Sequence, residues 1–345
     1  MPEEAEKKTG QQDAPLVSIC CIAFNQEKYI RETLDSFLMQ KTSFPFEVLI
    51  HDDASTDRTA DIIREYAANY PGIVKPVCQT ENQHSKGIAV GITFNYPRAQ
   101  GKYIALCEGD DYWTDPLKLQ KQFDFMEANP DYALCCSDAS KLIEESGITY
   151  TNKLSPTSRE LTYRELNGDI HVITATIFMR RDCVVECYQT IPKLRKRKWL
   201  MGDLPLVLYM AANHKVYYMS DSLACYRIHK NSMAHGNAAH QIRFLRSAAH
   251  IKLTFNRFYN RSDAELRTLI INDYISKCFR FIQTPGDLDI ELLEKFYKLY
   301  KRINRKSSFF DKTAVMFHLS KYFPWWIAVK DKLRFFALKY LLPAR

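Results

Sequence analysis

Apolar residues follow two alternating patterns in the first half of the chain. Residues 17–23 form an apolar run. Residues 27–40 then carry apolar residues at intervals of three and four, namely Ile30, Leu34, Phe37 and Leu38. A short continuous run is typical of a strand buried on both faces, and the second spacing is typical of an amphipathic helix. This segment therefore predicts a buried strand followed by a helix that covers the sheet.

The same unit recurs along the chain. Residues 46–50 form a second strand-like run, and a helix that begins near Ser55 or Asp57 follows it, with Ile62, Ile63 and Tyr66 on its apolar face. Residues 73–77 and 103–107 predict two further strands. Strands that alternate with helices favour a parallel sheet with right-handed crossovers. The fold class predicted is therefore α/β, with a doubly wound, nucleotide-binding type of layout.

The later elements are predicted in the same way. Residues 115–129 have a helical pattern, with Asp115 placed to cap the helix and Pro116 at its first position. The remaining predictions are strands at 132–136 and 173–179, a helix from Asp203 to about Ala212, and helices after residue 229.

Composition limits the class of protein. The chain has 345 residues, 46% of them hydrophobic, which allows one large domain with an appendage or two domains. No run of 18 or more uncharged apolar residues occurs, and residues 1–13 are polar and unlike a signal peptide. We therefore expect a cytosolic protein whose ten cysteines are reduced core residues.

The net charge of +8 is concentrated at the C-terminal end. Residues 301–345 hold eleven Lys or Arg against two acids, so the first 300 residues are close to neutral. A nucleic-acid-binding protein would be expected to carry its basic residues around the binding site, which argues against that class. A second basic stretch, residues 193–198, is interpreted equally well as a solvated surface or as a contact to phosphate or acceptor.

The strand at residues 103–107 ends in Glu108-Gly109-Asp110-Asp111. Carboxylates this close together repel one another unless they are solvated, hydrogen-bonded or shared by a cation. The strand at 46–50 also ends in acids, Asp52 and Asp53, and the carboxyl ends of parallel strands meet at one edge of a sheet. These residues predict a divalent cation that holds an anionic ligand, with a polar turn as the alternative. The turn at 23–27 has neither the G-x-G-x-x-G pattern nor a P-loop, which disfavours dinucleotide binding.

An ordered set of motifs resembles the family 2 glycosyltransferases with the GT-A fold, of the kind that assembles bacterial polysaccharides. In chain order, the motifs are residues 17–19 together with 24–30, residues 52–57, residues 101–104 together with 108–113, residues 202–203 and residues 226–232. The resemblance implies a mostly parallel central sheet and a C-terminal helical extension. It also implies three regions: a disordered tail (1–14), a catalytic domain (15–235) and a helical region (236–345) that ends in a basic amphipathic helix.

The same resemblance implies the roles of individual residues. The end of the first strand and the Asp53 position would bind the base and ribose of a sugar nucleotide, with uracil as the usual base. The residues concerned are Ala23, Asn25, Glu27, Asp53 and Asn82. The D-x-D motif falls on Glu108-Gly109-Asp110 and would bind Mg²⁺ or Mn²⁺, with Asp110 as the main ligand and Glu108 acting directly or through water. Asp111 would support them.

Three further assignments come from the C-terminal half of the motif set. Asp203 matches the catalytic base that takes the proton of the acceptor hydroxyl, although it could equally cap the helix that it begins. His229 would complete the metal shell or contact the diphosphate, and Arg227 and Ser232 resemble residues on a loop that closes over the nucleotide. The family's usual Ala-Arg-Asn segment reads Gly91-Ile92-Thr93-Phe94-Asn95 here, so Arg98 or Lys86 would have to replace its arginine.

The expected activity is therefore inverting, metal-dependent transfer of a sugar from a nucleoside-diphosphate sugar, UDP-linked, to a glycan or lipid-linked acceptor in cell-surface polysaccharide synthesis. A nucleotidyltransferase of the same fold and a non-catalytic, membrane-attached scaffold are the alternatives. After Pro324, the residues Trp326, Val329, Leu333, Phe336 and Tyr340 form one apolar helical face with basic flanks. This predicts contact with the inner face of the plasma membrane, with packing on the domain as the alternative.

Overall fold

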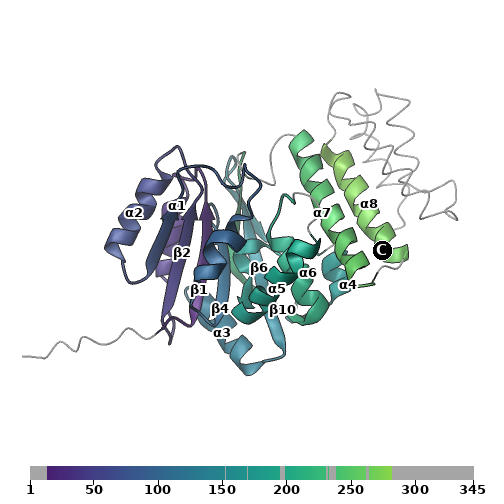
Figure 1. Ribbon diagram of the computed structural model, residues 1–345, viewed down its shortest axis with the longest axis horizontal. Coiled ribbons are helices and arrows are strands. Elements are labelled where there is room, and N and C mark those ends of the chain that lie inside the picture. The colour runs from purple at the N-terminus through teal and green to yellow at the C-terminus, as the bar shows by residue number, and fades with distance from the viewer. Residues whose placement is uncertain are drawn as a thin grey trace, which may run out of the picture.

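The computed structural model describes residues 14–281, apart from 152, 169, 195–198, 231, 233–237 and 262–263. Its strands form one ten-stranded sheet between layers of helices (Figure 1). Eight strands lie in the order β3 (Val74–Cys78), β2 (Phe46–Asp52), β1 (Val17–Ala23), β4 (Tyr103–Glu108), β9 (Phe178–Arg180), β6 (Tyr132–Ile143), β10 (Lys215–Ile228) and β5 (Tyr112–Trp113). β7 (Ile148–Thr151) pairs with β6, and β8 (Arg159–Leu161) pairs with β10.

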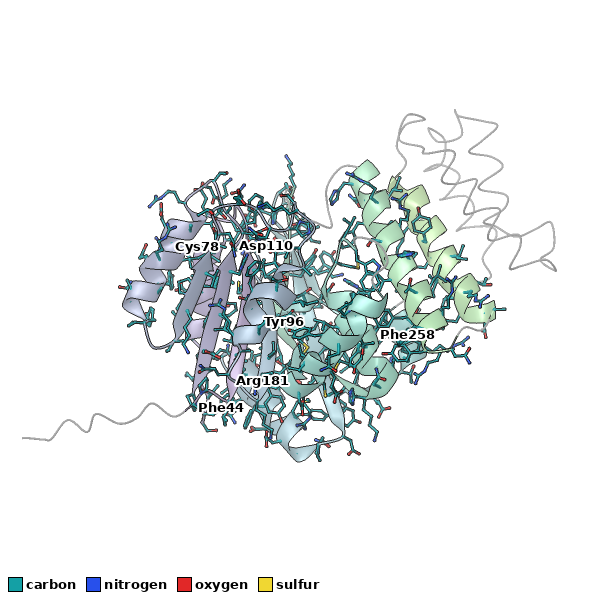
Figure 2. All side chains as sticks on the ribbon, viewed as in Figure 1. Phe44, Cys78, Tyr96, Asp110, Arg181 and Phe258 are labelled. Atoms are coloured by element: carbon teal, nitrogen blue, oxygen red, sulfur yellow. The ribbon has the colours of Figure 1, made fainter. Side chains whose placement is uncertain are left out.

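The half of the sheet that contains β3, β2, β1 and β4 is entirely parallel, as predicted. In its register Ala23 lies beside Asp52, and Ile22 lies beside Glu108. The acids that follow β2 and β4 therefore reach the same edge of the sheet. Figure 2 shows this arrangement, because Cys78 at the end of β3 lies at the same end of the sheet as Asp110.

The other half of the sheet is mixed, and β9 runs antiparallel to both β4 and β6. The strand predicted at 173–179 is only partly present, because Thr174–Thr176 forms a 3₁₀ turn before β9 begins. Side chains satisfy the carbonyls of this turn: Trp113 Nε1 donates to Ala175 O (2.9 Å) and Gln122 Nε2 to Thr176 O (2.9 Å). These carbonyls are therefore not available to a neighbouring strand.

Two long strands exceed the predictions. β6 has 12 residues where five were expected, and β10, with 14 residues, was not predicted. The two strands pair in parallel, and their register shifts at three places between Lys215 and Ala224. Such shifts interrupt the regular alternation of inward and outward side chains, which removes the pattern by which a strand is recognised in sequence.

Helices cover both faces of the sheet. One apolar core lies under α1 (Ile30–Leu38), α2 (Thr59–Asn69) and α3 (Lys118–Ala128), and it includes the predicted inward residues Ile30, Leu34, Phe37, Ile62, Ile63 and Tyr66. The second core lies under α4 (Tyr163–Asn167), α5 (Arg181–Leu194), α6 (Asp203–Asn213) and α7 (Ala238–Phe258). α5 was not predicted, and its last residues include the start of the basic stretch at 193–198, whose residues 195–198 lie outside the described part of the chain.

The predicted role of Asp115 is corrected by the start of α3. The N-cap of this helix is Leu117, which makes no side-chain capping bond. Asp115 lies in the turn before the helix, where its Oδ1 accepts a hydrogen bond from Leu117 N at 2.7 Å. Asp115 therefore stabilises the turn that leads into α3 and does not cap the helix itself.

The described helical region shares its core with the sheet. Ile251 and Phe255 of α7 are fully buried in the second core, and α7 also packs against α8 (Ala264–Phe281). Asn256 of α7 accepts a hydrogen bond from Asn167 Nδ2 of α4 at 2.8 Å. No described helix is long and apolar enough to cross a membrane, and the amphipathic helix predicted after Pro324 lies outside the described residues.

The nine cysteines whose side chains the structure describes form no disulfide. Eight of these nine are buried, as expected for core residues, and the exception is Cys78, which is half-buried. Burial raises the pKa of the Cys21 and Cys107 thiols well above the usual value, so these groups stay protonated and act as small apolar residues.

Lys118, the first residue of α3, is fully buried. Its ammonium group donates to Gln122 Oε1 at 2.7 Å and lies 4.1 Å from the centre of the Trp113 ring. Burial lowers the pKa of Lys118 to about 7. Above that pH the folded protein carries neutral Lys118, whereas the unfolded chain keeps its proton up to about pH 10. The folded state is therefore stabilised as pH rises through this window.

We expect the free energy of unfolding of the wild type to rise by about 2 kcal/mol relative to Lys118→Met between about pH 7 and about pH 9.5. Urea unfolding of both proteins at the two pH values measures this difference. Methionine does not titrate, so the variant isolates the contribution of Lys118. An unchanged difference between the two proteins would show that the ammonium group is not desolvated in the folded state.

Candidate active site

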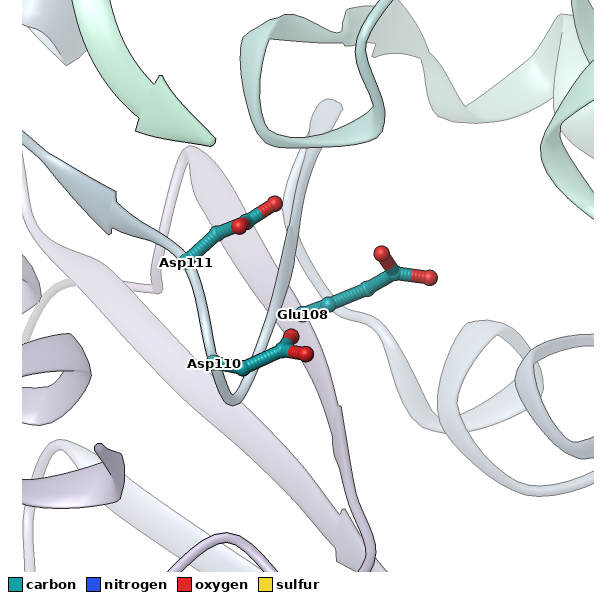
Figure 3. A group of neighbouring side chains, drawn as sticks. All are labelled: Glu108, Asp110 and Asp111. Atoms are coloured by element: carbon teal, nitrogen blue, oxygen red, sulfur yellow. The ribbon is translucent and has the colours of Figure 1, made fainter. Parts of the chain in front are cut away.

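The centre of the site is the turn of residues 108–111 at the end of β4. Glu108, Asp110 and Asp111 leave this turn on the same side (Figure 3), and ligand oxygens of the three lie within 4.8 Å of one another. We call this group the acid turn. Thr33 of α1 holds it in place, because its hydroxyl lies 2.7 Å from Asp111 O and 3.0 Å from Gly109 O.

Gly109 allows the acid turn to pack closely on the loop after β1. A Cβ atom at this position would lie 3.0 Å from Ala23 Cβ and 3.1 Å from Ile30 Cδ1, and it would overlap the side-chain oxygen of Gln26. Any side chain would therefore push the acid turn away from β1. Ala23, predicted to contact the nucleotide, is buried directly beside this turn.

Burial and mutual repulsion disfavour the charged forms of the carboxyl groups in the acid turn. Burial, followed by the charges of Asp110 and Glu108, raises the pKa of Asp111 well above its usual range. Solvent reaches Glu108, yet the surrounding protein and the charges of Asp110 and Asp203 raise its pKa to about 8. Asp111 accepts a bond from Arg227 N at 2.8 Å through Oδ1, whereas its buried Oδ2 has no hydrogen-bond partner among the described residues.

These residues fit a divalent cation. Carboxylate oxygens are the ligands that Mg²⁺ and Mn²⁺ prefer, and a bound cation would remove the repulsion that raises both pKa values. The buried Oδ2 of Asp111 is an oxygen that a cation could satisfy. The prediction named Asp110, Glu108 and His229 as ligands and gave Asp111 a supporting role, and the structure brings Asp111 into the same group.

His229 lies beside the acid turn, as the resemblance implied. Its Nε2 is 2.9 Å from Asp110 Oδ2, and its ring packs on that of Tyr29 with 4.8 Å between ring centres. Ser232 forms a turn with it, in which His229 N donates to Ser232 Oγ (3.3 Å) and Ser232 N donates to His229 O (3.0 Å). In this arrangement Ser232 positions His229, and its predicted contact with the nucleotide stays a prediction.

Arg227 lies against the acid turn with its guanidinium group fully engaged. Its Nε donates to Asp110 O at 3.0 Å, its Nη1 donates to Glu144 Oε2 at 2.7 Å, and its Nη2 pairs with Glu32. The guanidinium carbon also lies 4.7 Å from the centre of the Tyr29 ring. This geometry favours a role in positioning the acid turn over the direct nucleotide contact implied by the resemblance.

We expect Arg227→Met to lower the free energy of unfolding by about 2 kcal/mol, because it leaves two carboxylates and a carbonyl without their partner. The partners Glu32 and Glu144 are partly exposed, which keeps the loss below that of a fully buried ion pair. Arg31→Met is the matched control, since Arg31 forms a two-pronged but exposed pair with Glu65. Its removal is expected to leave the free energy of unfolding nearly unchanged, because solvent screens an exposed pair. Urea unfolding that gives equal losses for both variants would contradict this assignment.

The predicted nucleotide-binding residues after β1 connect two loops. Asn25, in the left-handed region at φ 53°, donates its backbone N–H to Ser55 Oγ and accepts from Thr56 N at 2.8 Å. Glu27 accepts from Arg58 N at 3.0 Å. Both side chains are exposed at the carboxyl edge of the sheet. The structure therefore brings Asn25 and Glu27 to this edge, and their contact with a nucleotide stays a prediction.

Asp53 and Asn82 meet at the same edge, on the β2 side. The two carboxylate oxygens of Asp53 accept hydrogen bonds from Gln83 N (2.8 Å) and His84 N (3.0 Å), and Asn82 Nδ2 donates to Asp53 O (3.0 Å). Asp53 is only 2% exposed. Its carboxylate thus holds the loop after β3 in place, and the predicted contact with a base or ribose is not tested by this arrangement.

Arg98 and Lys86, the two residues considered as replacements for the family's arginine, both have partners within the protein. Arg98 is held within the sheet, where Nη1 donates to Lys75 O at 2.8 Å and Nη2 to Ile50 O at 3.0 Å. Lys86 forms an exposed ion pair with Glu81. Arg98 therefore has a structural role between β2 and β3.

Asp203 is the first residue of α6, and the N-cap of this helix is Gly202, which corrects the alternative assignment of Asp203 as the cap. Asp203 Oδ1 accepts from its neighbour Leu204 N at 2.8 Å, and Oδ2 accepts from Thr174 Oγ1 at 3.0 Å. The charge of Asp203 contributes to the raised pKa of Glu108. The structure therefore places the predicted base close to the acid turn, although 95 residues separate Asp203 from Glu108 in sequence.

Several contacts of the site were not predicted. Glu32 and Glu144 hold Arg227, and Thr174 hydrogen-bonds Asp203. Each of these partners is at least 29 residues from the residue that it contacts. Spacing within a helix or strand gives no signal for such pairs, because only the packing of distant segments brings them together.

A model of a known protein family matches the N-terminal half of the chain. The model described as Glycosyl transferase family 2 matches residues 18–189. A Mycobacterium tuberculosis relative, the uncharacterized protein Rv1520, is 35% identical over 244 residues, which cover 68% of this chain and 65% of the relative. The chain thus spans about two thirds of the length of this relative.

Several relatives are named as glycosyltransferases. The Bacillus subtilis protein named putative teichuronic acid biosynthesis glycosyltransferase TuaG is 30% identical over 227 residues, covering 64% of this chain and 82% of that protein. The crystal structure of Staphylococcus aureus TarS 1–349 in complex with UDP-GlcNAc aligns with a TM-score of 0.51 and 16% identity, covering 84% of this chain and 90% of that chain. At this identity the alignment shows a common fold, in agreement with the GT-A fold that the motifs implied.

Proposed function

The chain belongs to glycosyl transferase family 2, and on this premise we propose that it is an inverting, metal-dependent glycosyltransferase. The donor is a nucleoside-diphosphate sugar, with UDP as the carrier. The acceptor is a hydroxyl group of a glycan or of a lipid-linked saccharide. One observation carries the proposal: Asp203 is near enough to the acid turn, at the carboxyl end of β4, for its charge to add to the rise in the pKa of Glu108.

The acid turn would hold a divalent cation, which would supply positive charge to the donor's diphosphate. Asp110, Glu108 and Asp111 would provide its oxygen ligands, and His229 lies within hydrogen-bonding distance of Asp110. Bound Mg²⁺ or Mn²⁺ would neutralise the negative charge that develops on the departing nucleoside diphosphate. Arg227 keeps the turn in position, because its backbone N–H donates to Asp111 Oδ1 and its Nε donates to Asp110 O. Asn25, Glu27, Asp53 and Asn82 frame the nucleoside end of the site.

Asp203 acts as the general base. Its carboxylate takes the proton from the acceptor hydroxyl while that oxygen forms a bond to the anomeric carbon. The bond between the anomeric carbon and the diphosphate oxygen breaks in the same step, and its electron pair leaves with the nucleoside diphosphate. A single base suffices because no covalent sugar–enzyme intermediate forms, and attack from the face opposite the leaving group inverts the anomeric configuration.

The named relatives support a role in cell-surface glycan synthesis. TuaG is named for teichuronic acid biosynthesis. An Escherichia coli relative named UDP-Glc:alpha-D-GlcNAc-diphosphoundecaprenol beta-1,3-glucosyltransferase WfaP is 38% identical over 112 residues, covering 32% of this chain and 41% of that protein. We place the protein in the cytoplasm, peripheral on the inner face of the plasma membrane, where lipid-linked acceptors reside.

The two alternative functions make different predictions. A nucleotidyltransferase would be expected to carry a glycine-rich phosphate loop after the first strand, and the turn at 23–27 contains no glycine. A non-catalytic scaffold would have no use for a carboxylate placed beside the acid turn, as Asp203 is. Both features favour glycosyl transfer.

A donor panel tests the proposal. The purified full chain is incubated with Mn²⁺ or Mg²⁺ and with UDP-GlcNAc, UDP-Glc, UDP-Gal or GDP-Man, and release of the nucleoside diphosphate is measured with and without EDTA. We expect one UDP-sugar to be turned over and EDTA to abolish the release. Release of pyrophosphate from a nucleoside triphosphate and a sugar phosphate would identify a nucleotidyltransferase. Turnover that is unaffected by EDTA would contradict the role of the acid turn.

A further inference from the structure

Asp203 has a single side-chain partner among the described residues, the hydroxyl group of Thr174. Thr174 Oγ1 lies 3.0 Å from Asp203 Oδ2, while Asp203 Oδ1 accepts the N–H of Leu204 in its own helix. Each carboxylate oxygen can accept more than one hydrogen bond, so both keep capacity for an acceptor hydroxyl. The orientation of the carboxylate is therefore set by one contact from another element.

That contact comes from a rigid support. Thr174 begins the 3₁₀ turn Thr174–Thr176, in which Ala175 and Thr176 are fully buried. Trp113 Nε1 and Gln122 Nε2 donate to the carbonyls of these two residues, and Leu106 N of β4 donates to Ile177 O at 3.0 Å. The turn is thus fastened to the strand that carries the acid turn.

We infer that Thr174 is a positioning residue for the reaction, which aims the Asp203 carboxylate at the acceptor hydroxyl and ties the base to the strand that bears the acid turn. The inference rests on the proposed function for its catalytic meaning. The alternative is a structural contact that only braces the start of α6.

Other titratable groups face Asp203 and must be separated from this effect. Burial is the main cause of the shifted pKa values of Glu108 on β4, of Tyr96 in the 3₁₀ turn Tyr96–Arg98, of Tyr226 on β10 and of His171 in the segment before the turn. The charge of Asp203 adds to the rise of the first three and opposes the fall at His171. None of these groups loses a partner when the Thr174 hydroxyl is removed. A comparison of variants at position 174 therefore isolates the contribution of this one contact.

The experiment compares Thr174→Val, Thr174→Ser and the matched control Thr176→Val. The control removes a hydroxyl from the same turn that bonds only to Ile173 O (2.7 Å) and does not contact Asp203. Carbon-13 NMR of labelled aspartate at one neutral pH reports the surroundings of the Asp203 carboxyl group by its chemical shift, assigned by the signal that is absent in Asp203→Asn. The kcat and the KM for the UDP-sugar turned over in the donor panel are measured in parallel.

We expect Thr174→Val to move the carboxyl signal of Asp203, because the carboxylate loses its one hydrogen bond from another element. We expect its kcat at neutral pH to fall about tenfold, with KM for the donor unchanged. Thr174→Ser and Thr176→Val should match the wild type in both measurements. A Thr174→Val protein with the carboxyl signal and the kcat of Thr176→Val would overturn the inference and leave Thr174 as a brace.

The two readouts separate this inference from the proposed function. If the wild type turns over no donor, the proposed function fails, while the NMR signal still decides whether Thr174 holds the Asp203 carboxylate. If donor turnover requires Asp203 but Thr174→Val changes neither readout, only the inference fails. Should Thr174→Val not fold, Thr174→Ala removes the same hydroxyl with a smaller side chain and carries the same expectations.

Discussion

Replacement of Asp203 by asparagine is expected to lower kcat about a thousandfold, while KM for the donor changes little. The amide has nearly the same shape as the carboxylate and can keep the contacts with Thr174 and Leu204. It cannot take the proton of the acceptor hydroxyl, because a neutral amide is not a base at neutral pH. Steady-state release of nucleoside diphosphate, measured over a range of donor concentrations, separates kcat from KM.

Asp182→Asn is the matched control for this experiment. Asp182 lies in the first turn of α5 and accepts a hydrogen bond from the next backbone N–H, Cys183 N, at 2.8 Å, as Asp203 does from Leu204 N. It is exposed and makes no contact with the acid turn. The control should keep the wild-type rate. If Asp203→Asn also kept that rate, Asp203 would be only a residue that stabilises the start of α6.

Replacement of Asp110 by asparagine is the second change with a large expected effect. Asp110 is the acid of the turn whose carboxylate contacts His229. A carboxylate oxygen of Asp110 also lies within 4.8 Å of those of Glu108 and Asp111. The amide removes one negative charge and one strong ligand from the predicted cation site. We expect the affinity for Mn²⁺ to fall about a hundredfold and kcat/KM for the donor to fall about a thousandfold.

Two measurements check this prediction independently. Electron paramagnetic resonance of free Mn²⁺ gives the affinity for the ion without any substrate, and the donor assay gives kcat/KM. Asp131→Asn is the control, because Asp131 is an exposed carboxylate that forms only a loose pair with Lys215 at 3.6 Å. Full Mn²⁺ affinity in Asp110→Asn would move the cation site away from the acid turn.

The predicted parallel half of the sheet and its acidic edge are confirmed for a simple reason. β1, β2 and β4 are buried on both faces, so each appears in sequence as a continuous apolar run, and each ends at the point where polar residues begin. Parallel pairing then requires that the ends of all three strands meet. The proximity of Asp52 and Glu108 to Ala23 at one edge thus followed from local patterns and one topological rule.

The mixed half of the sheet could not be predicted in the same way. β10 is interrupted by register shifts, and the residues at its far end alternate between buried and half-buried. Its last part carries Arg227, whose partners come from α1 and from the turn after β6. The resemblance implied that Arg227 belongs to the site. Its position against the acid turn depends on hydrogen bonds with Glu32 and Glu144, which lie 195 and 83 residues from it in sequence.

Local periodicity and side-chain chemistry were enough to predict the α/β class, the strands that carry acids at their ends, and the residue types suited to a cation and a base. These features can be recognised along the chain without its folded form. The folded chain was needed to show which groups act on one another: Asp111 within the acid turn, Arg227 against it, and Thr174 on Asp203. Hydrogen bonds and charge interactions depend on distances of a few ångströms, and only the packing of remote segments sets those distances.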